Sequence, residues 1–227
     1  MRLAGVDTVL FDMDGTISSS GSLALEAAEE GLRRFYREAG ESAPIPPRAE
    51  IRGMIGLPSN VYFARLVPER LAPRWQEVRR HVLSLEIEAL EAGRGGMFEG
   101  TAETLGALKS AGLRLGLVTN AGRGYYAATW QALRLESFFS VGLCIDDAPG
   151  GTKADLVKRA AEQLGTRKGA MVGDKVYDVD AGKAAGFATV GCTWGYGSAA
   201  ELSGADHVID DIRRLPALLG LWPAEPR

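Results

Sequence analysis

Apolar residues along the chain follow two different periods, which divide the sequence into two kinds of region. Short runs of β-branched and other apolar residues are typical of buried parallel strands. Six such runs occur, at residues 6–11, 113–119, 141–145, 169–173, 187–192 and 207–209. Segments with helical spacing lie between them, such as 101–111, 124–135 and 153–164. This alternation predicts an α/β fold, with a doubly wound parallel sheet that is covered by helices on both faces.

Residues 18–95 differ, because their apolar positions keep helical spacing and no strand-like run interrupts them. The steps of three and four are seen in Leu25, Ala28, Leu32, Phe35 and Ala39. Such spacing predicts amphipathic helices that bury one face against each other. Small, flexible residues flank the region, ISSSGS on one side and GRGG on the other, and suit linkers. We therefore predict a helical bundle at 18–95, inserted into an α/β domain formed by 1–17 and 96–227.

Composition excludes several classes of protein. The chain has 227 residues, 46% hydrophobic and 24% charged, with a formal net charge of -3, which is the profile of a globular protein of one or two domains. The charges are dispersed, so a nucleic-acid partner is not expected. No stretch approaches the ~20 apolar residues of a membrane span, and Asp7, Asp12 and Asp14 fall where a secretory signal needs an apolar core. We expect a cytoplasmic protein with no membrane association.

Cysteine and histidine offer little chemistry here. Cys144 and Cys192 each lie inside an apolar run, and neither has the spacing of a metal or redox motif, so buried thiols are the simplest interpretation. His81 and His207 are the only histidines, and they are far apart in sequence. If the protein is an enzyme, its chemistry rests on carboxylates.

The first motif with chemical potential ends the first predicted strand and reads Asp12-Met13-Asp14-Gly15-Thr16. Carboxylates at i and i+2 on an extended backbone point to the same side, and Gly15 allows a sharp turn after them. Asp12 could attack an electrophile while Asp14 gives and takes a proton. The alternative is a solvated Asp-Gly turn, which explains one carboxylate better than two.

Two further motifs carry groups suited to binding phosphate. Thr119 and Asn120 end the strand at 113–119, and their side chains, with nearby backbone N–H groups, can donate to phosphate oxygens. Lys153 opens a helix, where the helix dipole disfavours a cation, so its position suggests a role. Taken alone, ordinary turn chemistry explains Thr119 and Asn120, and a solvated surface lysine explains Lys153.

The fourth motif, Gly173-Asp174-Lys175-Val176-Tyr177-Asp178, follows the strand at 169–173. Asp174 lies at the strand end, and Asp178 would lie one helical turn further on the same face. Carboxylates placed in this way are suitable oxygen ligands for Mg²⁺. A helix cap at Asp174 is the alternative, and it explains one aspartate well and the pair poorly.

In this order, the four motifs resemble those of the haloacid dehalogenase-like (HAD) superfamily, over essentially the whole chain. The insertion at 18–95 resembles the helical C1 cap of the phosphoglycolate phosphatase and β-phosphoglucomutase branch. The segment 193–206, with Thr193-Trp194-Gly195-Tyr196-Gly197-Ser198, is similar to phosphoglycolate phosphatase-like members. The resemblance implies a Rossmann-like catalytic core at 1–17 and 96–227, with a helical cap at 18–95.

The resemblance also implies roles for the residues of the first three motifs. Asp12 would be the nucleophile that forms an aspartyl-phosphate, and Asp14 would protonate the leaving alcohol and then activate water. Thr119, Asn120 and Lys153 would hold the phosphoryl oxygens. The lysine segment reads Thr-Lys-Ala-Asp where relatives usually have Lys-Pro.

A Mg²⁺ cofactor follows from the same resemblance. The ion would be held by the Asp12 carboxylate, the Asp14 backbone carbonyl and Asp174, with Asp178 nearby as an outer ligand or orienter. In the cap, Arg52 lies in a loop where related caps meet the substrate and could grip a second anionic group. A solvated helix arginine is an equally good interpretation of Arg52.

Three functions fit these motifs. The first is a Mg²⁺-dependent phosphatase of small phosphorylated metabolites, with phosphoglycolate as the leading candidate. A sugar phosphomutase of the β-phosphoglucomutase type would use the same aspartyl-phosphate but return the group to its substrate. A metal-binding scaffold without activity is the third, and the retained cluster of charges argues against it, since clustered carboxylates destabilise a fold unless a cation offsets them. The sequence allows a monomer or a homodimer.

Overall fold

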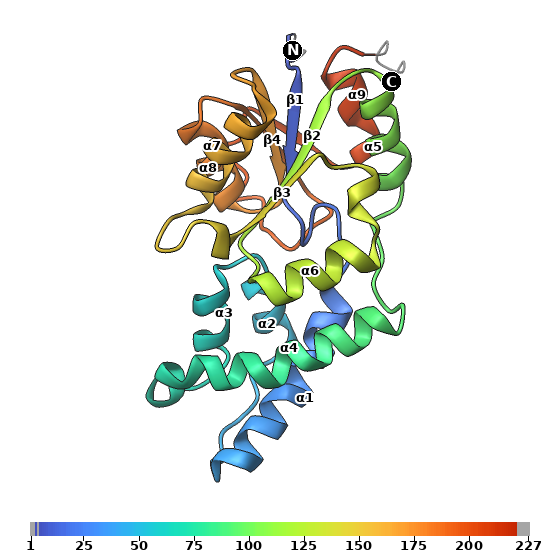
Figure 1. Ribbon diagram of the computed structural model, residues 1–227. Coiled ribbons are helices and arrows are strands. Elements are labelled where there is room, and N and C mark those ends of the chain that lie inside the picture. The colour runs from blue at the N-terminus through green and yellow to red at the C-terminus, as the bar shows by residue number, and fades with distance from the viewer. Residues whose placement is uncertain (1–2, 4, 222–227) are drawn as a thin grey trace.

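The computed structural model describes residues 3 and 5–221 and contains one six-stranded parallel sheet (Figure 1). The strand order is β3-β2-β1-β4-β5-β6. The strands are β1 (Thr8–Phe11), β2 (Arg114–Thr119), β3 (Val141–Cys144), β4 (Gly169–Gly173), β5 (Ala188–Cys192) and β6 (His207–Ile209). Each falls inside a run selected from the sequence, so the prediction of a doubly wound α/β sheet is confirmed.

The two faces of the sheet are buried because successive side chains of each strand point to opposite sides. Val9 and Phe11 pack in one hydrophobic cluster, and Leu10, between them, packs in another. The first cluster includes residues of α5 (Thr101–Ser110) and α9 (Leu215–Leu218), and the second includes residues of α7 (Lys153–Leu164) and α8 (Val176–Ala184). Figure 1 shows these two pairs of helices on opposite sides of the sheet. The sheet is therefore a rigid support for whatever follows the ends of its strands.

A second group of helices lies beyond one end of the sheet (Figure 1). Its members are α1 (Gly21–Ala39), α2 (Arg48–Met54), α3 (Ser59–Arg65) and α4 (Trp75–Glu91). They share a hydrophobic cluster of their own, in which Leu32 and Phe35 of α1 pack with Val78 and Val82 of α4. Helix α6 (Arg123–Ala132) lies between this bundle and the sheet. Short 3₁₀ helices occur at Glu69–Arg74, Leu135–Ser137, Ile145–Asp147 and Ile212–Arg214.

The two segments that join the bundle to the sheet lie side by side. The backbone N–H of Ser19 donates to the carbonyl of Gly96 at 2.9 Å, and Ser18 forms an isolated bridge with Met97. Paired crossings of this kind suit a hinge, because the chain enters and leaves the bundle at one place. The domain boundaries at 17/18 and 95/96 stay predictions from the sequence.

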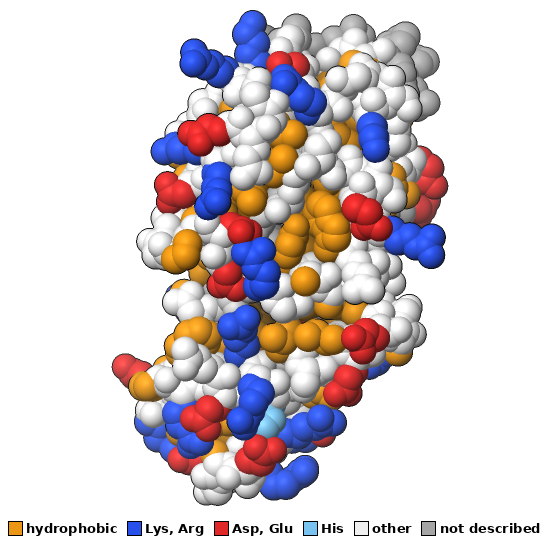
Figure 2. Space-filling view, viewed as in Figure 1, with side chains coloured by type: hydrophobic (Ala, Val, Ile, Leu, Met, Phe, Trp, Pro, Cys, Tyr) orange, Lys and Arg blue, Asp and Glu red, His pale blue; other side chains and the backbone are white. Residues whose placement is uncertain are grey.

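The surface carries acidic and basic side chains intermixed, with hydrophobic side chains gathered between the sheet and the bundle on the face in Figure 2. Among the described residues, no helix is both long and apolar enough to cross a membrane. Cys144 and Cys192 are free thiols and both are buried, as the sequence predicted.

Candidate active site

The predicted motifs converge at one edge of the sheet. Asp12 directly follows β1, Thr119 ends β2 and Asp174 directly follows β4, and all three strands are parallel neighbours. The carboxyl ends of parallel strands meet at the same edge, which is where α/β proteins place their ligands. The backbone N–H of Asp12 donates to the carbonyl of Val172 at 2.9 Å and extends the pairing of β1 with β4 to this edge.

Lys153 joins the first and fourth motifs. It is the first residue of α7, where a capping box between Thr152 and Asp155 fixes the start of the helix. Its Nζ donates to Asp12 Oδ1 and pairs with Asp178 Oδ1 at 2.6 Å, and the side chain is only 5% exposed. Burial alone would lower the pKa of Lys153, but the two carboxylates outweigh burial and raise the pKa above its ordinary value. The lysine is therefore a permanent cation inside the site, and a solvated surface position is excluded.

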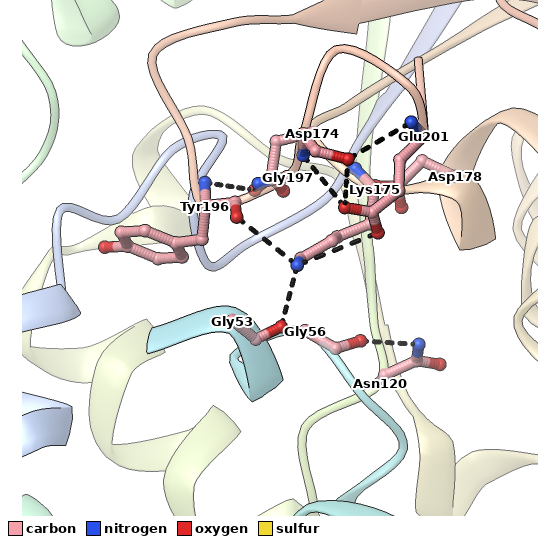
Figure 3. Close-up of polar contacts among 10 residues, drawn as sticks. Gly53, Gly56, Asn120, Asp174, Lys175, Asp178, Tyr196, Gly197 and Glu201 are labelled. Carbon is pink, nitrogen blue, oxygen red and sulfur yellow. Dashed lines mark hydrogen bonds and ion pairs between the residues drawn. The ribbon is translucent and has the colours of Figure 1, made fainter. Parts of the chain in front are cut away.

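Asp174 is fixed by backbone donors on one oxygen and has no partner on the other. Its Oδ2 accepts from the N–H groups of Tyr196 at 2.7 Å and Gly197 at 3.1 Å (Figure 3). Its Oδ1 is buried and has no hydrogen-bond partner among the described residues. Burial, reinforced by the neighbouring carboxylate of Asp178, raises the pKa of Asp174 to about 7. A buried oxygen held in this way is suited to a cation.

The carboxylates fit a divalent metal ion. Asp12, Asp174 and Asp178 are all buried, and each offers a ligand atom within 4.8 Å of those of the other two. Gly15 lies beside them with a φ of 85°, and a Cβ atom there would collide with the Asp174 carboxylate. Hard oxygen donors with an unpartnered buried oxygen among them suit a hard cation such as Mg²⁺. Asp178 is also engaged elsewhere, since its Oδ2 accepts from the N–H of Lys175 at 2.9 Å.

Asp14 faces two hydroxyl groups that sequence reasoning missed. Its Oδ1 accepts from the Ser20 hydroxyl at 2.6 Å and from the Tyr125 hydroxyl at 3.0 Å. Burial raises the pKa of Asp14 above its ordinary value, and these two hydrogen bonds oppose the effect. Ser20 lies six positions after Asp14 in a Ser-rich loop, and Tyr125 lies in α6 with no motif around it. The sequence therefore held no pattern that could have revealed Tyr125.

Thr119 and Asn120 take different directions. The Thr119 side chain is buried, lines the cavity beside Asp12, and accepts from the N–H of Ala121 at 3.1 Å. The Asn120 amide instead donates to the carbonyl of Gly56 in the helical bundle at 3.0 Å (Figure 3). Its backbone carbonyl accepts from the N–H of Ser59 at 3.2 Å. In this arrangement Asn120 links the sheet to the bundle.

Lys175 makes a second link of the same kind. Its Nζ donates to the carbonyl of Gly53 at 3.0 Å and to that of Tyr196 at 3.4 Å (Figure 3). Nearby, the guanidinium carbon of Arg52 lies 5.0 Å from the centre of the Tyr196 ring, a cation–π contact. Arg52 is exposed and is not among the residues that line the cavity. Arg52 and Gly53 belong to α2 and not to a loop as predicted, so the C-terminal end of α2 is attached to the edge of the sheet.

A cavity of about 70 Å³ lies between the sheet edge and the bundle. Asp12, Asp14 and Thr119 line it from the sheet, whereas Tyr62 and Glu86 line it from the bundle. Glu86 is 6% exposed, and its pKa is raised to about 8 by burial and, to a smaller extent, by the negative charge of Asp14. Neither Tyr62 nor Glu86 was selected from the sequence, because at helical spacing each resembles an ordinary position on an amphipathic helix.

Comparison with known proteins agrees with this geometry. The family model of the haloacid dehalogenase-like hydrolases matches residues 6–186. The chain is similar to a phosphoglycolate phosphatase of Escherichia coli O157:H7, with 33% identity over 96% of this chain and 94% of that protein. A phosphoglycolate phosphatase of Shigella boydii is 32% identical, over 96% of this chain and 94% of its own length.

Solved structures share the fold. A predicted phosphoglycolate phosphatase from Haemophilus somnus superposes with a TM-score of 0.82 at 22% identity, over 94% of this chain and 97% of that one. CbbY from Rhodobacter sphaeroides, solved in complex with phosphate, has a TM-score of 0.78 at 20% identity, over 95% and 100%. The prediction of an enzyme of this superfamily is confirmed. The chain belongs to the haloacid dehalogenase-like hydrolases and is a phosphatase of that family.

Proposed function

We propose that the protein is a Mg²⁺-dependent phosphatase that hydrolyses small phosphomonoesters through an aspartyl-phosphate on Asp12. The observation that carries the proposal is the buried group of Asp12, Lys153 and Asp174 at the carboxyl edge of the sheet, with Asp14 two residues from the nucleophile. Phosphoglycolate is the first ester to test, because the relatives with about one third identity are named for it.

The charge of the site explains why cations are needed. An aspartate that approaches a phosphate dianion at ~4 Å meets a repulsion on the order of several kcal/mol at an effective dielectric constant of ~20. Lys153 supplies one positive charge at the Asp12 oxygen. Mg²⁺, held by the Asp12 and Asp174 carboxylates and the Asp14 backbone carbonyl, would supply two more and so offset the charge on the phosphoryl group.

The side chains of Asp12 and Asp14 divide the chemistry. The Asp12 carboxylate forms a bond to phosphorus while the bond from phosphorus to the leaving oxygen breaks, and Asp14 gives that oxygen its proton. Asp14 then takes a proton from a water molecule, which attacks the phosphorus and releases inorganic phosphate from Asp12. The hydroxyls of Ser20 and Tyr125 hold Asp14 in place during both steps. Thr119, on the cavity wall, is placed to donate to the phosphoryl oxygens.

The test is phosphate release from phosphoglycolate, sugar phosphates, nucleotides and an aryl phosphate, with Mg²⁺ or with EDTA. Wild type is compared with Asp12→Asn, and Asp180→Asn is the matched control because Asp180 is exposed on α8. We expect Asp12→Asn to lower turnover by about 10³-fold or more, since it removes the nucleophile. Asp180→Asn keeps wild-type rates.

Two results would contradict the proposal. Unchanged hydrolysis by folded Asp12→Asn would show that Asp12 is not the nucleophile. Full activity in EDTA would show that the reaction needs no metal ion. Acid-quenched wild type should also carry a covalent phosphoryl group that Asp12→Asn lacks. Release of free phosphate separates hydrolysis from the transfer of phosphate back to a sugar.

A further inference from the structure

The wall of the cavity that belongs to the helical bundle carries two polar side chains without partners. Glu86 of α4 is 6% exposed, and no hydrogen bond or ion pair to its carboxyl group occurs within the described residues. The Tyr62 hydroxyl of α3 is buried and also has no partner in that part of the chain. Both side chains line the cavity that contains Asp12 and Asp14. Buried polar groups are normally hydrogen-bonded, so an unpartnered phenol beside a carboxyl group that borders the same cavity suits a ligand that bonds to both.

The rest of this wall is apolar. Ile55, Leu57, Phe63 and Leu83 line the same space. Mostly apolar walls with a few placed polar groups are typical of small-molecule sites. Here the polar groups lie on the side opposite the nucleophile, where the part of the ester that leaves must lie. Glu86 and Tyr62 are therefore placed to bind the leaving group, whereas the phosphoryl group meets Asp12 and Lys153.

The size of the cavity limits the leaving group. Its volume of about 70 Å³ marks it as a small cavity that is larger than the space one water molecule needs. A short alcohol fits this space, whereas a nucleoside would have to extend into the open cleft that shares Ser59 and Arg79 with the cavity.

The charged side chains on the cavity wall limit which short alcohols can be the leaving group. Arg79 is the one cationic side chain among the described residues that line the cavity, and it also lines a larger open cleft outside, so it lies near the mouth. A second carboxylate inside would lose its water with no cation other than Arg79 on the described walls, and burying an unpaired charge is costly. A hydroxyl group, by contrast, can donate to Glu86 and accept from Tyr62 at the same time.

Glu86 also differs from a typical partner for an ammonium group. Since burial raises its pKa to about 8, most of it is uncharged near neutral pH. An uncharged carboxyl group and a phenol match a neutral hydroxyl better than they match a cation.

We propose that Glu86 and Tyr62 bind the leaving group of the ester, and that this group is a short alcohol with a further hydroxyl and no carboxylate. The inference rests on the proposed phosphatase reaction and gives it a substrate class, the phosphate monoesters of small polyols. It also separates this chain from relatives named for phosphoglycolate, whose leaving group carries a carboxylate.

The experiment measures kcat/KM with Mg²⁺ for glycerol 3-phosphate, 2-phosphoglycolate, phosphoethanolamine and an aryl phosphate. Wild type should prefer glycerol 3-phosphate to 2-phosphoglycolate by about tenfold or more. Glu86→Gln removes the acid and keeps the shape, so we expect the ratio of 2-phosphoglycolate to glycerol 3-phosphate to rise about tenfold. Tyr62→Phe should lower kcat/KM for glycerol 3-phosphate about fivefold, since one hydrogen bond is lost, and change that for 2-phosphoglycolate little.

Glu88→Gln is the matched control, because Glu88 is exposed on the same helix and the substitution is the same. It should leave the ratio unchanged. A wild-type ratio above one, or a ratio that neither Glu86→Gln nor Tyr62→Phe moves, would overturn the inference and leave the phosphatase intact. If phosphoethanolamine is turned over fastest, the bundle wall binds an ammonium group and not a hydroxyl group, which would also overturn the inference. Failure of wild type on all four esters, the aryl phosphate included, would instead refute the proposed reaction, and this inference with it.

Discussion

The two walls of the active-site cavity are built on different principles. On the sheet side, the polar groups largely hold one another, as Lys153 does with Asp12 and as Ser20 does with Asp14. On the bundle side, apolar side chains line the cavity together with Glu86 and Tyr62, and the Tyr62 hydroxyl has no partner within the described residues. Apart from the Asp174 oxygen that is left for a cation, the sheet-side wall is held together before any substrate arrives, and we expect the substrate to complete the other wall.

This difference follows from what each wall rests on. The sheet residues follow the ends of parallel strands that are buried on both faces, so their backbone positions are fixed. The bundle residues lie on helices that join the sheet through two adjacent crossings and a few contacts. Charged groups held in position are what phosphoryl transfer requires, whereas a wall on a separate element can vary without loss of the chemistry. We therefore expect the sheet side to carry out the reaction and the bundle side to select the ester.

The largest expected effect comes from the sheet side. Asp14→Asn keeps the shape of the side chain but removes its ability to transfer a proton. We expect kcat for an alkyl phosphate to fall about 10²–10⁴-fold, the usual contribution of general acid–base catalysis. An aryl phosphate has a leaving group that needs no proton, so its first turnover should still appear as a burst. Rapid-quench measurements on both esters check this.

Asp180→Asn again serves as the control, and it should change neither ester. Equal losses for the alkyl ester and for the aryl burst would show that Asp14 acts on binding and not on proton transfer. Wild-type rates of Asp14→Asn for both esters would show that another residue is the general acid. The sheet side would then not carry the chemistry that we assign to it.

The second prediction concerns the stability of the bundle side. Burial raises the pKa of Glu86 from an ordinary value of 4.5 to about 8. Between these values the folded chain keeps the proton that the unfolded chain loses, so Glu86 lowers the stability of the fold as the pH rises through this range. Glu86→Gln does not titrate. It should therefore be more stable than wild type near pH 8 by on the order of a few kcal/mol, with the gap nearly closed near pH 5.

Urea unfolding in EDTA at several pH values measures this gap directly. Glu88→Gln, exposed on the same helix, should follow wild type throughout. A gap that stays constant with pH would mean that Glu86 keeps its ordinary pKa when buried, and the bundle wall would then carry a full negative charge.

Sequence reasoning reached the sheet side and missed most of the bundle side, for a physical reason. Asp12, Thr119 and Asp174 stand at the ends of apolar runs, and parallel strands bring such ends together whatever lies between them. Glu86 and Tyr62 lie in helices, where a polar residue near an apolar face has many ordinary explanations. Their importance arises from where α3 and α4 are placed against the sheet, which no local pattern records.

Lys175 lies between these two cases. It stands inside the fourth motif, yet its position gave no hint that its side chain reaches Gly53 of the bundle. Asn120 likewise reaches Gly56. Both residues follow strands of the sheet, and both side chains contact the bundle. Substitutions at these positions therefore test how the two walls are held together.

The smallest expected effect belongs to this attachment. Lys175→Gln shortens the side chain and removes its charge, so the bonds to the carbonyls of Gly53 and Tyr196 are lost. Hydrogen bonds to a charged group contribute ~1.5–3 kcal/mol at most, and Asn120 still holds the bundle, so we expect KM to rise about five- to tenfold with a smaller change in kcat. The same rise for every ester would mark a role in closure and not in the choice of substrate.

Lys183→Gln is the control, because Lys183 is exposed on α8, the helix that Lys175 precedes. A rise in KM for 2-phosphoglycolate alone would mean that Lys175 contacts the leaving group. The sheet side would then also contribute to the choice of ester. An unchanged KM would mean that the contacts of Asn120 and Arg52 suffice to hold the bundle closed. Because the Lys175 ammonium group contacts Gly53, Tyr196 and Glu201 and neither Glu86 nor Asp14 within the described residues, a uniform shift in KM would be consistent with separate roles for the two walls.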